Sequence, residues 1–452
     1  MTAPTLRRRS ILALMGTTAL LPFVPQIARA QVPGVTIIAL ADLHSAYDRS
    51  AQLLAEIARQ VTASSGPAVI VLNGDLFELG NKVTIASGGE IDWTMLAAFA
   101  DLAPTIVNIG NHEPDIDPDL ANFVARAQGH GIIVLSNLTD TRSGAGYAPA
   151  SVTLDLGGQA VTFVGIATDA LFTYPAATRE MIAAPEPVAW ANEHLPALMG
   201  PGINVILSHA GVVADRQILP LLPDGALLVG GHDHLDFEHA EGATRYIHTG
   251  SWSTAIRTAY IAAPGAAASI SRIAIDPAAE AEPRLAALIE SIMATHLGDG
   301  DRESVGTSPA AMGVDEVGLM AAAALAAAGN GDAGFIGHTS FGAGLPAGAV
   351  SRYEFDGSVR FDGKLMAAEV SPEVLAEIMA RANQVGDFPL AQRSGDFLYA
   401  APQPGDARPF WRIVTNDWSA RNQASYFGRE DLEFTEIAGA PGVKDAILAA
   451  LR

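Results

Sequence analysis

The sequence predicts two α/β units, a larger layered one first and a smaller one after it. Apolar runs of strand length recur between residues 34 and 234, and each leads into a loop rich in Gly, Asn, Asp or His. Stretches with helical periodicity separate several of them, which is typical of sheets whose polar residues gather at the strand ends. The chain has 452 residues, 49% of them hydrophobic, which is enough for two ordinary cores. The expected strands lie at 34–44, 67–78, 104–113, 131–138, 160–167, 203–211 and 226–234.

The remaining elements follow from periodicity and from residues that end helices. Residues 46–66 have the apolar spacing of a helix that stops at its final glycine. Residues 245–262 are strand-like, and an Ala-, Pro- and Glu-rich stretch then leads into an amphipathic run. The Ala-rich segment 315–329 has high helix propensity. We therefore expect a first domain at 31–276, a linker and helix at 277–299, and a second domain at 300–452.

Residues 1–30 have the pattern of an export signal and are not expected to belong to the fold. A basic start precedes a short apolar run, and Ala28 and Ala30 have the spacing of a cleavage site. The arginine pair at 8–9 resembles a twin-arginine signal. The apolar run is too short to span a bilayer comfortably, and no other segment reads as a span, so we expect no membrane insertion. The protein is thus predicted to reach a Gram-negative periplasm, with its signal removed near Ala30.

The chain is strongly acidic and contains no cysteine. Its net charge is −22, and removal of residues 1–30 takes away four arginines, which gives −22 − 4 = −26. This charge argues against a nucleic-acid polymer as partner. The absence of cysteine excludes disulfides, thiolate metal ligands and a cysteine nucleophile. Protein partners and oligomeric state are left open by the sequence.

Eight polar side chains stand where an apolar strand gives way to a loop. Singly, each has an ordinary explanation as a turn residue or a hydrogen-bonded strand end. Together they offer the imidazole, carboxylate and amide groups that first-row divalent metals accept. Two pairs have i, i+2 spacing, which projects both side chains to one side of an extended strand. This inventory indicates two metal ions that share one carboxylate. The residues are Asp42, His44, Asp75, Asn111, His112, His209, His232 and His234.

Five sequence blocks, in this order, resemble those of the calcineurin-like metallophosphoesterases. Within that superfamily the chain looks most like the exported 5′-nucleotidase branch. The resemblance implies a four-layer β-sandwich flanked by helices for the first domain, and a smaller α/β substrate domain after it. The blocks are DLH (42–44), GD (74–75), GNHEPD (110–115), SHAG (208–211) and GHDH (231–234).

The resemblance also implies two sets of metal ligands, with Asp75 as the bridging carboxylate. His234 stands where the nucleotidase branch often has Gln, which changes the ligand type and keeps the site. Ligands of this kind accept Mn, Zn, Fe or Co, so the identity of the two divalent ions is open. One ion would be bound by Asp42, His44, Asp75 and His234, and the other by Asp75, Asn111, His209 and His232.

The GNHEPD block is implied to hold the catalytic residue as well as a ligand. His112 would stabilise charge on the phosphoryl group or protonate the leaving oxygen. Asp115 would orient His112, fix its tautomer and raise its basicity. Glu113 and Asp117 have no assigned chemistry and are interpreted as loop charges. The predicted reaction is in-line attack of a metal-activated water on phosphorus.

The C-terminal half resembles the branch more loosely. Nucleotidases of this branch carry a GG-x-R segment whose arginine contacts phosphate, but the matching stretch 335–344 has no arginine. They also stack the base between aromatics near a GGDG sequence, which 414–428 lacks. His338 is expected to be a hydrogen-bonded turn residue. Arg352, Arg360, Arg393 and Arg421 are candidates for an anion fork. Candidate substrate residues are Asn416, Trp418, Tyr426 and Phe427, of which the aromatics could equally be core.

The leading prediction is a periplasmic metal-dependent phosphoesterase whose substrate is a small phosphorylated metabolite, with a nucleotide as first choice. A second hypothesis keeps the two metals and changes the ester to a cyclic-nucleotide or sugar-nucleotide diester, or to a sulfur-oxyanion ester. A third is a non-catalytic ligand-binding protein in which the first domain is a scaffold. Substrate tests and metal content distinguish the three.

Overall fold

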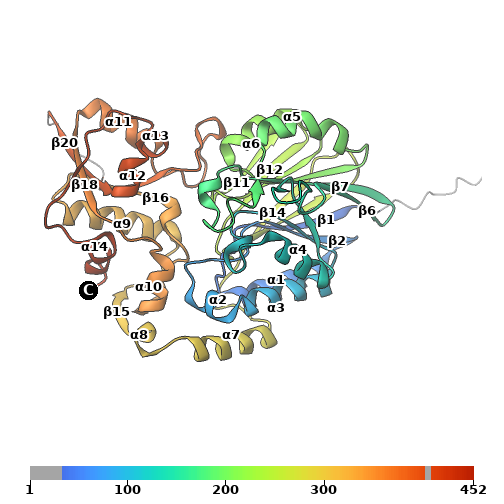
Figure 1. Cartoon of the computed structure of the whole chain (residues 1–452), viewed down its shortest axis with the longest axis horizontal. Coiled ribbons are helices and arrows are strands. Elements are labelled where there is room, and N and C mark those ends of the chain that lie inside the picture. The colour runs from blue at the N-terminus through green and yellow to red at the C-terminus, as the bar shows by residue number, and fades with distance from the viewer. Residues whose placement is uncertain (1–32, 403–408) are drawn as a thin grey trace, which may run out of the picture. The chain divides into compact units, whose positions relative to one another are not determined.

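The computed structural model describes residues 33–402 and 409–452, so the predicted export signal lies outside the described residues. The first half is built on two six-stranded sheets (Figure 1). In the first sheet, four strands run parallel, and β13 and β14 extend it antiparallel at one side. Its strands, in spatial order, are β14 (Ser269–Ala274), β13 (Ala255–Ile261), β1 (Val35–Leu40), β2 (Ala68–Asn73), β3 (Thr105–Asn108) and β4 (Ile133–Leu135).

The second sheet has the same number of strands and a parallel centre. Strands β12, β10, β9 and β7 run parallel, and antiparallel strands form both edges. Its strands, in spatial order, are β11 (Asp236–Glu241), β12 (Thr244–Thr249), β10 (Leu227–Gly230), β9 (Ile203–His209), β7 (Gln159–Ala167) and β6 (Ser151–Leu156).

The two sheets pack face to face over a shared apolar core. On β1, Val35, Ile37 and Ala39 face this core, while the alternate residues Ile38 and Leu40 face the helices on the other side. This follows from the two-residue period of a strand. Because the central strands are buried on both faces, they read in the sequence as continuous apolar runs. The predicted layered α/β fold is confirmed.

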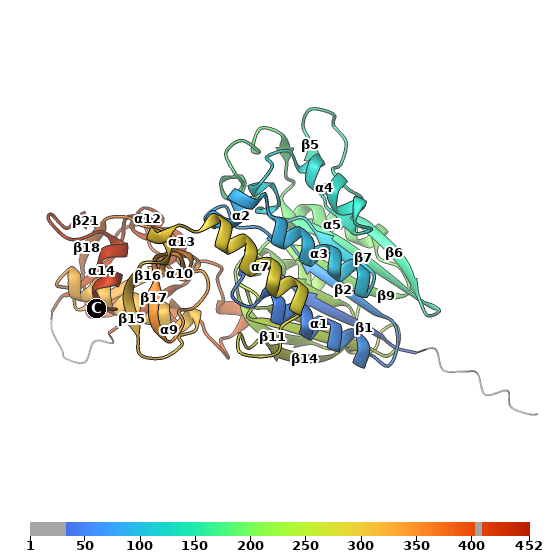
Figure 2. The same ribbon diagram turned by 90° about the horizontal axis from the view of Figure 1, so that it is seen from below.

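Helices cover the outer face of each sheet. Helix α7 buries Leu285, Ile289 and Ile292, whose spacing places them on one face. Its start is fixed by Pro283 and by the Glu282 carboxylate, which accepts the Leu285 N–H at 2.6 Å. Figure 2 shows α7 lying alongside α1 and α3. The first-sheet helices are α1 (Ser50–Ala63), α2 (Lys82–Ser87), α3 (Glu90–Leu102), α4 (Leu120–Gly129) and α7 (Pro283–His296), and the second-sheet helices are α5 (Pro187–Leu198) and α6 (Val212–Ile218).

Short elements connect these layers. A two-stranded ladder of β5 and β8 lies outside the main sheets. The 3-10 turns mark sharp changes of direction after a strand or helix. These elements are β5 (Thr139–Asp140), β8 (Ile182–Ala183), η1 (Glu113–Asp115), η2 (Leu171–Thr173) and η3 (Leu219–Leu221).

The C-terminal half contains a five-stranded sheet of order β19-β16-β20-β18-β21 and a separate ladder of β15 and β17. Helix α9 packs on this sheet, and the small side chains of its Ala-rich sequence permit a close approach to β16. The strands are β15 (Ser304–Ser308), β16 (Ala333–Gly337), β17 (Gly348–Ser351), β18 (Leu365–Val370), β19 (Leu398–Ala401), β20 (Trp411–Asn416) and β21 (Thr435–Glu436). The helices and turns are α8 (Asp299–Arg302), α9 (Val314–Ala328), η4 (His338–Ser340), α10 (Arg352–Ser358), α11 (Pro372–Arg381), η5 (Leu390–Gln392), α12 (Asp417–Arg421), α13 (Gln423–Phe427) and α14 (Val443–Ala449).

The helices were also compared with the length and hydropathy that a bilayer requires. Within residues 33–402 and 409–452, none of them is both long enough and apolar enough to cross a membrane.

The buried carboxyl group of Asp92 in the helix layer should make stability depend on pH. Burial raises its pKa to about 7, and the hydrogen bond from Tyr47 Oη at 2.5 Å does not offset this. Between about pH 4 and pH 7 the folded state keeps a proton that the unfolded state releases, so the free energy of unfolding falls as pH rises. Asp92→Asn lacks this loss. The free energy of unfolding of the variant, relative to that of the wild type, should therefore rise by about 2 kcal/mol from pH 5 to pH 7, as measured by urea unfolding. A difference that stays constant with pH would contradict the prediction.

Candidate active site

The predicted ligands gather where the carboxyl ends of both sheets meet. Strands β1, β2 and β3 are parallel neighbours in the first sheet, and β9 and β10 are parallel neighbours in the second. Below the site, two buried asparagines join the sheets. Asn73 Nδ2 donates to the main-chain oxygens of Ser208 and Val229 at 2.8 and 2.9 Å. Asn108 Nδ2 donates to Asn73 Oδ1 at 2.9 Å. These two asparagines were not identified from the sequence.

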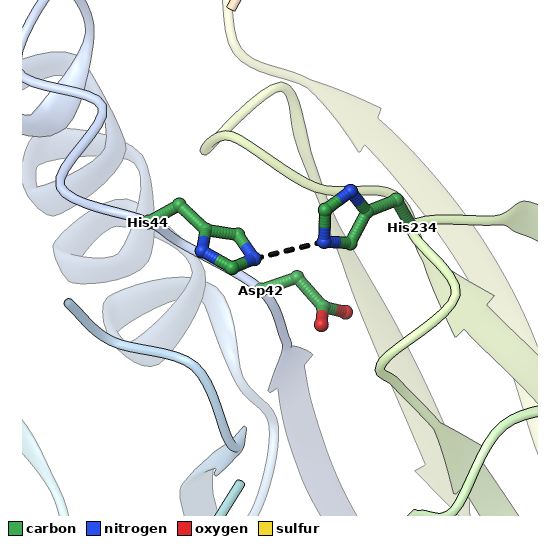
Figure 3. A group of neighbouring side chains, drawn as sticks. All are labelled: Asp42, His44 and His234. Carbon is green, nitrogen blue, oxygen red and sulfur yellow. Dashed lines mark hydrogen bonds between the residues drawn. The ribbon is translucent and has the colours of Figure 1, made fainter. Parts of the chain in front are cut away.

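Asp42, His44 and His234 form the first cluster of candidate ligands (Figure 3). The two rings point their Nε2 atoms at each other across 2.8 Å. His44 is buried and His234 is half-buried, and the structure brings the two rings together from the loop after β1 and from the loop after β10. Two neutral imidazole nitrogens at this distance need a proton or a cation between them. The cluster therefore fits a cation site.

Asp75, His209 and His232 form the second cluster, and Asn111 completes it. His209 Nδ1 lies 2.7 Å from the Asn73 main-chain oxygen, so Nδ1 is the donor and Nε2 carries the lone pair in a neutral ring. That Nε2 lies 3.1 Å from Asp75 Oδ2 but outside hydrogen-bond geometry. His232 Nδ1 lies 2.8 Å from Asn111 Oδ1. Lone pairs that converge in this way fit a second cation.

Asp75 lies between the two clusters. Its Oδ2 is 3.1 Å from His209 Nε2 and 3.8 Å from His44 Nε2. Its Oδ1 accepts the main-chain N–H of His112 at 2.9 Å, which holds the carboxylate plane in place. The geometry therefore suits the bridging role that the sequence resemblance implies for this residue.

The backbone at the candidate ligands is strained. Non-glycine residues seldom adopt a positive φ, and each such residue costs of order 1–3 kcal/mol unless its surroundings hold it there. Ten non-glycine residues in the described part of the chain have positive φ, and five of them are predicted ligands. This concentration of strain is typical of a functional site. The five are Asp42 (53°), His44 (47°), Asp75 (60°), His232 (76°) and His234 (55°).

Burial and neighbouring charges together set the pKa values in the cluster. Burial raises the pKa of Asp42 well above its usual range, and the nearby Asp75 carboxylate adds to the effect. Burial alone would also raise the pKa of Asp75, but His209 and His112 hold it well below its usual range. Burial lowers the pKa of His232 to about 3. Divalent cations would compensate the buried carboxylates and favour neutral imidazoles, so the donor set fits a metal centre.

His112 and Asp115 form a bonded pair beside the clusters. The 3-10 turn η1 brings Asp115 back toward His112, so that Asp115 Oδ2 lies 2.7 Å from His112 Nδ1. The same carboxylate oxygen accepts the Leu79 N–H at 2.6 Å. Burial would lower the pKa of His112, but the Asp115 and Asp75 carboxylates outweigh it and raise that pKa to about 10. The ring thus keeps Nε2 for contact with a substrate.

The interpretation of Glu113 as a loop charge is wrong. Its side chain is 1% exposed, and its two carboxylate oxygens accept the N–H groups of Leu76 at 3.0 Å and Gly110 at 2.6 Å. Glu113 thus holds the loops after β2 and β3 together, next to Asp75. Asp117, in contrast, accepts hydrogen bonds from the Asp119 N–H and from the Asn122 side chain in the first turn of α4.

Asp115→Asn should reduce turnover without removing metal. The amide cannot supply the negative charge that fixes the His112 tautomer and raises its pKa, so we expect kcat to fall by about 10- to 100-fold. Metal analysis after dialysis should give the wild-type content, because Asp115 is not a predicted ligand. A wild-type kcat in this variant would show that the pair has no role in turnover.

A cavity of about 1450 Å³ connects the candidate ligands to the C-terminal half. Asn416, Trp418 and Tyr426 line it, and Trp418 is 47% exposed. Asn416 also caps α12 by accepting the Ser419 N–H at 2.9 Å. Phe427 does not line the cavity. It is 1% exposed in the hydrophobic core beside Phe335, which corresponds to the core alternative that the sequence left open for these aromatics.

The four candidate arginines have different surroundings. Arg360 and Arg421 line the cavity. Arg393 is 3% exposed and donates to the main-chain oxygens of Gln384 and Gly386, which is a structural role. Arg352 is the first residue of α10 and does not line the cavity.

Two further residues touch the cluster and were not identified from the sequence. Glu78 Oε2 lies 3.3 Å from His44 Nδ1 and accepts Arg360 Nη2 at 2.6 Å. Trp252 stacks on His44 with ring centroids 4.6 Å apart, and its main-chain N–H donates to the Asp42 main-chain oxygen at 2.7 Å. Both residues restrict how the His44 ring can turn.

The fold has relatives of known structure at low sequence identity. A 5′-nucleotidase precursor from Thermus thermophilus is 15% identical, covers 92% of this chain and 96% of its own, and superposes with a TM-score of 0.58. The sulfate thiohydrolase SoxB from the same organism is 14% identical, with 92% and 94% covered and a TM-score of 0.58. The 5′-nucleotidase from Candida albicans is 11% identical, with 93% and 99% covered and a TM-score of 0.56. At these identities the likeness is one of fold.

The first half of the chain also matches the model of a known protein family. Residues 35–236 match the model described as calcineurin-like phosphoesterase, a range that contains all seven candidate ligands and the His112–Asp115 pair. No curated protein sequence matches the chain. Residues 35–236 are therefore a calcineurin-like phosphoesterase domain.

Proposed function

We propose that the protein hydrolyses small phosphate monoesters with two divalent metal ions, and that a 5′-nucleotide is the first substrate to test. The observation that carries this proposal is the convergence of two ligand clusters beside a bonded His112–Asp115 pair. A cavity that reaches the C-terminal half leaves room for an alcohol or nucleoside attached to the phosphate. The names of two structural relatives, both 5′-nucleotidases, support the same substrate class.

The two metal ions would be held by the sets that the resemblance implies, with Asp75 common to both. When bound, they would polarise the phosphoryl group and lower the pKa of water for attack. The first set is Asp42, His44, Asp75 and His234, and the second is Asp75, Asn111, His209 and His232.

The protein's own residues would handle orientation and the proton. His112 would be protonated near neutral pH, because Asp115 and Asp75 raise its pKa, and its Nε2 would donate to the oxygen of the departing alcohol. Asp115 would keep the ring oriented through Nδ1. Glu113 and Glu78 would hold the ligand loops in place from outside the cluster.

Export to the periplasm is part of the proposal and rests on residues 1–30. The arginine pair and the cleavage-site spacing support it. A structural relative named as a precursor is consistent with it. The division of the chain at residues 276 and 299 into a catalytic and a substrate domain is likewise proposed.

A different ester is the second candidate function. The stretch 335–344 has no arginine and the stretch 414–428 lacks the GGDG sequence, so two sequence features that the resemblance associates with nucleotide binding are missing. The sulfate thiohydrolase SoxB superposes with the same TM-score as the nucleotidase precursor. A sulfur-oxyanion ester or a phosphodiester is therefore the alternative substrate class.

Hydrolysis by the metal-loaded mature chain, residues 31–452, tests the proposal. The substrates are 5′-AMP, a cyclic nucleotide, UDP-glucose and p-nitrophenyl phosphate, with a thiosulfate ester for the second candidate. Preference for 5′-AMP would support the nucleotidase assignment. Cleavage of only a diester or the sulfur ester would move the assignment to the second candidate. Two bound ions with no cleavage of any ester would favour a ligand-binding protein.

A further inference from the structure

His338, in the C-terminal half, makes a direct contact with the segment that carries two predicted ligands. Its Nε2 lies 2.7 Å from the Asp233 main-chain oxygen, and because a carbonyl only accepts, Nε2 is the donor. The ring is 4% exposed and stacks on Phe397 with centroids 4.0 Å apart. The His338 main-chain N–H also donates to the Phe397 oxygen at 3.1 Å. The ring is thus held firmly by its own half of the chain.

The side chain of Asp233 is held from two sides as well. Its carboxylate accepts the Val212 N–H at 2.5 Å, at the start of the helix that follows His209. Gly395 of the C-terminal half packs against the same carboxylate so closely that a Cβ there would overlap it. Asp233 is 8% exposed. Its carbonyl and its carboxylate are therefore both restrained, and each restraint includes a contact from the C-terminal half.

These restraints act on a segment whose backbone is strained. His232 and His234, on either side of Asp233, have φ values of 76° and 55°. Non-glycine residues with positive φ keep this conformation only where the surrounding structure holds them in it. The hydrogen bond from His338 reaches the carbonyl between the two strained residues. Loss of that bond would free the segment to relax and would turn both imidazoles away from their present positions.

We propose that His338 is a positioning residue for the metal centre, and that through it the C-terminal half contributes to metal affinity as well as to the cavity. The inference rests on the two-metal site proposed above. Each proposed ion takes one ligand from the segment 232–234, His234 for the first and His232 for the second. Removal of the hydrogen bond should therefore weaken both ions, whereas loss of a single ligand would weaken one set more than the other.

The test compares variants that keep or remove the donor. His338→Leu fills a similar volume without a donor, and His338→Gln keeps an N–H near the position of Nε2. Calorimetric titration of the metal-free mature chain with Mn²⁺ should show an affinity about 10- to 100-fold lower for both ions in His338→Leu. His338→Gln should restore most of it. His239→Leu, on the edge strand β11, is the matched control and should bind as the wild type does.

Two results of this titration would contradict the role of His338. Wild-type affinity in His338→Leu would overturn the inference, and so would an equal loss in His338→Gln, because shape rather than the donor would then matter. If the wild type itself takes up no Mn²⁺, the two-metal proposal is what fails. If His338→Leu does not fold, as judged by the melting of the metal-free protein, His338→Phe serves instead, because it keeps a ring against Phe397 and removes the donor. Wild-type affinity in that variant would also overturn the inference.

Discussion

His112→Ala should lower kcat by about 10²- to 10⁴-fold while both metal ions stay bound. The ring of His112 is held by Asp115 through Nδ1 and lines the cavity, so Nε2 can reach a substrate oxygen. Alanine removes that proton donor. Rates with an alkyl phosphate, whose leaving oxygen needs a proton, and metal content after dialysis measure the two halves of the prediction.

The leaving group distinguishes a proton donor from a charge that merely stabilises the phosphoryl oxygens. If His112 protonates the departing oxygen, an alkyl phosphate should lose far more rate in His112→Ala than p-nitrophenyl phosphate, because nitrophenolate departs without a proton. Equal losses would assign His112 to charge stabilisation. His130→Ala, on the loop after α4, is the control.

Loss of an ion in His112→Ala would contradict the assignment in another way. His44, Glu78 and His112 have ligand atoms within 4.8 Å of one another, so these three side chains could also hold a cation. In that case His112 would be a ligand, and the search for the proton donor would move to another group that lines the cavity.

The positions of the candidate ligands were predictable because each lies at the end of an apolar strand or within a few residues after it. Asp75 comes two residues after β2, and His209 is the last residue of β9. The residue that follows a buried parallel strand must lie at the carboxyl end of the sheet. Its position can therefore be predicted from that strand alone. Parallel pairing then brings the ends together. The fold class and the position of the candidate site follow from the same pattern.

Residues that support the ligands from other loops were not predictable. Glu113 has the appearance of a loop charge in the sequence, and only the folded chain shows that it joins the loops after β2 and β3. Glu78 and Trp252 both contact His44, although they follow it in the sequence by 34 residues (78 − 44) and 208 residues (252 − 44). No periodicity links such residues. Their pairing depends on how the loops pack.

The aromatic residues of the C-terminal half show the same limit. Tyr426 and Phe427 are adjacent and both belong to the core, being 6% and 1% exposed, yet of the two only Tyr426 also lines the cavity. Both lie on the short helix α13, where neighbouring side chains point about 100° apart. A helix of this length has too few turns for its buried face to be read from composition.

Asp75→Asn should remove at least one metal ion and lower hydrolysis by more than about 100-fold, since loss of a supporting partner alone costs about 10- to 100-fold. Dialysed protein should hold one ion or none, where the wild type is expected to hold two. Asp117→Asn is the matched control, because Asp117 lies in the same group of loops but its carboxylate accepts from Asp119 and Asn122, neither of which is a candidate ligand. It should keep the wild-type metal content and rate.

The effect should be large because of the way the side chain is held. The His112 N–H donates to Asp75 Oδ1, so the oxygen of an asparagine would take that position and its NH₂ would replace Oδ2. The NH₂ would then face His209 Nε2 and His44 Nε2, which lie 3.1 and 3.8 Å from Asp75 Oδ2 in the wild type. A donor would occupy the place where a cation must bind, and one of the buried negative charges that offset the ions would be lost. If Asp75→Asn nevertheless kept two ions and its rate, Asp75 would not bridge them, and the two clusters would have to bind metal independently.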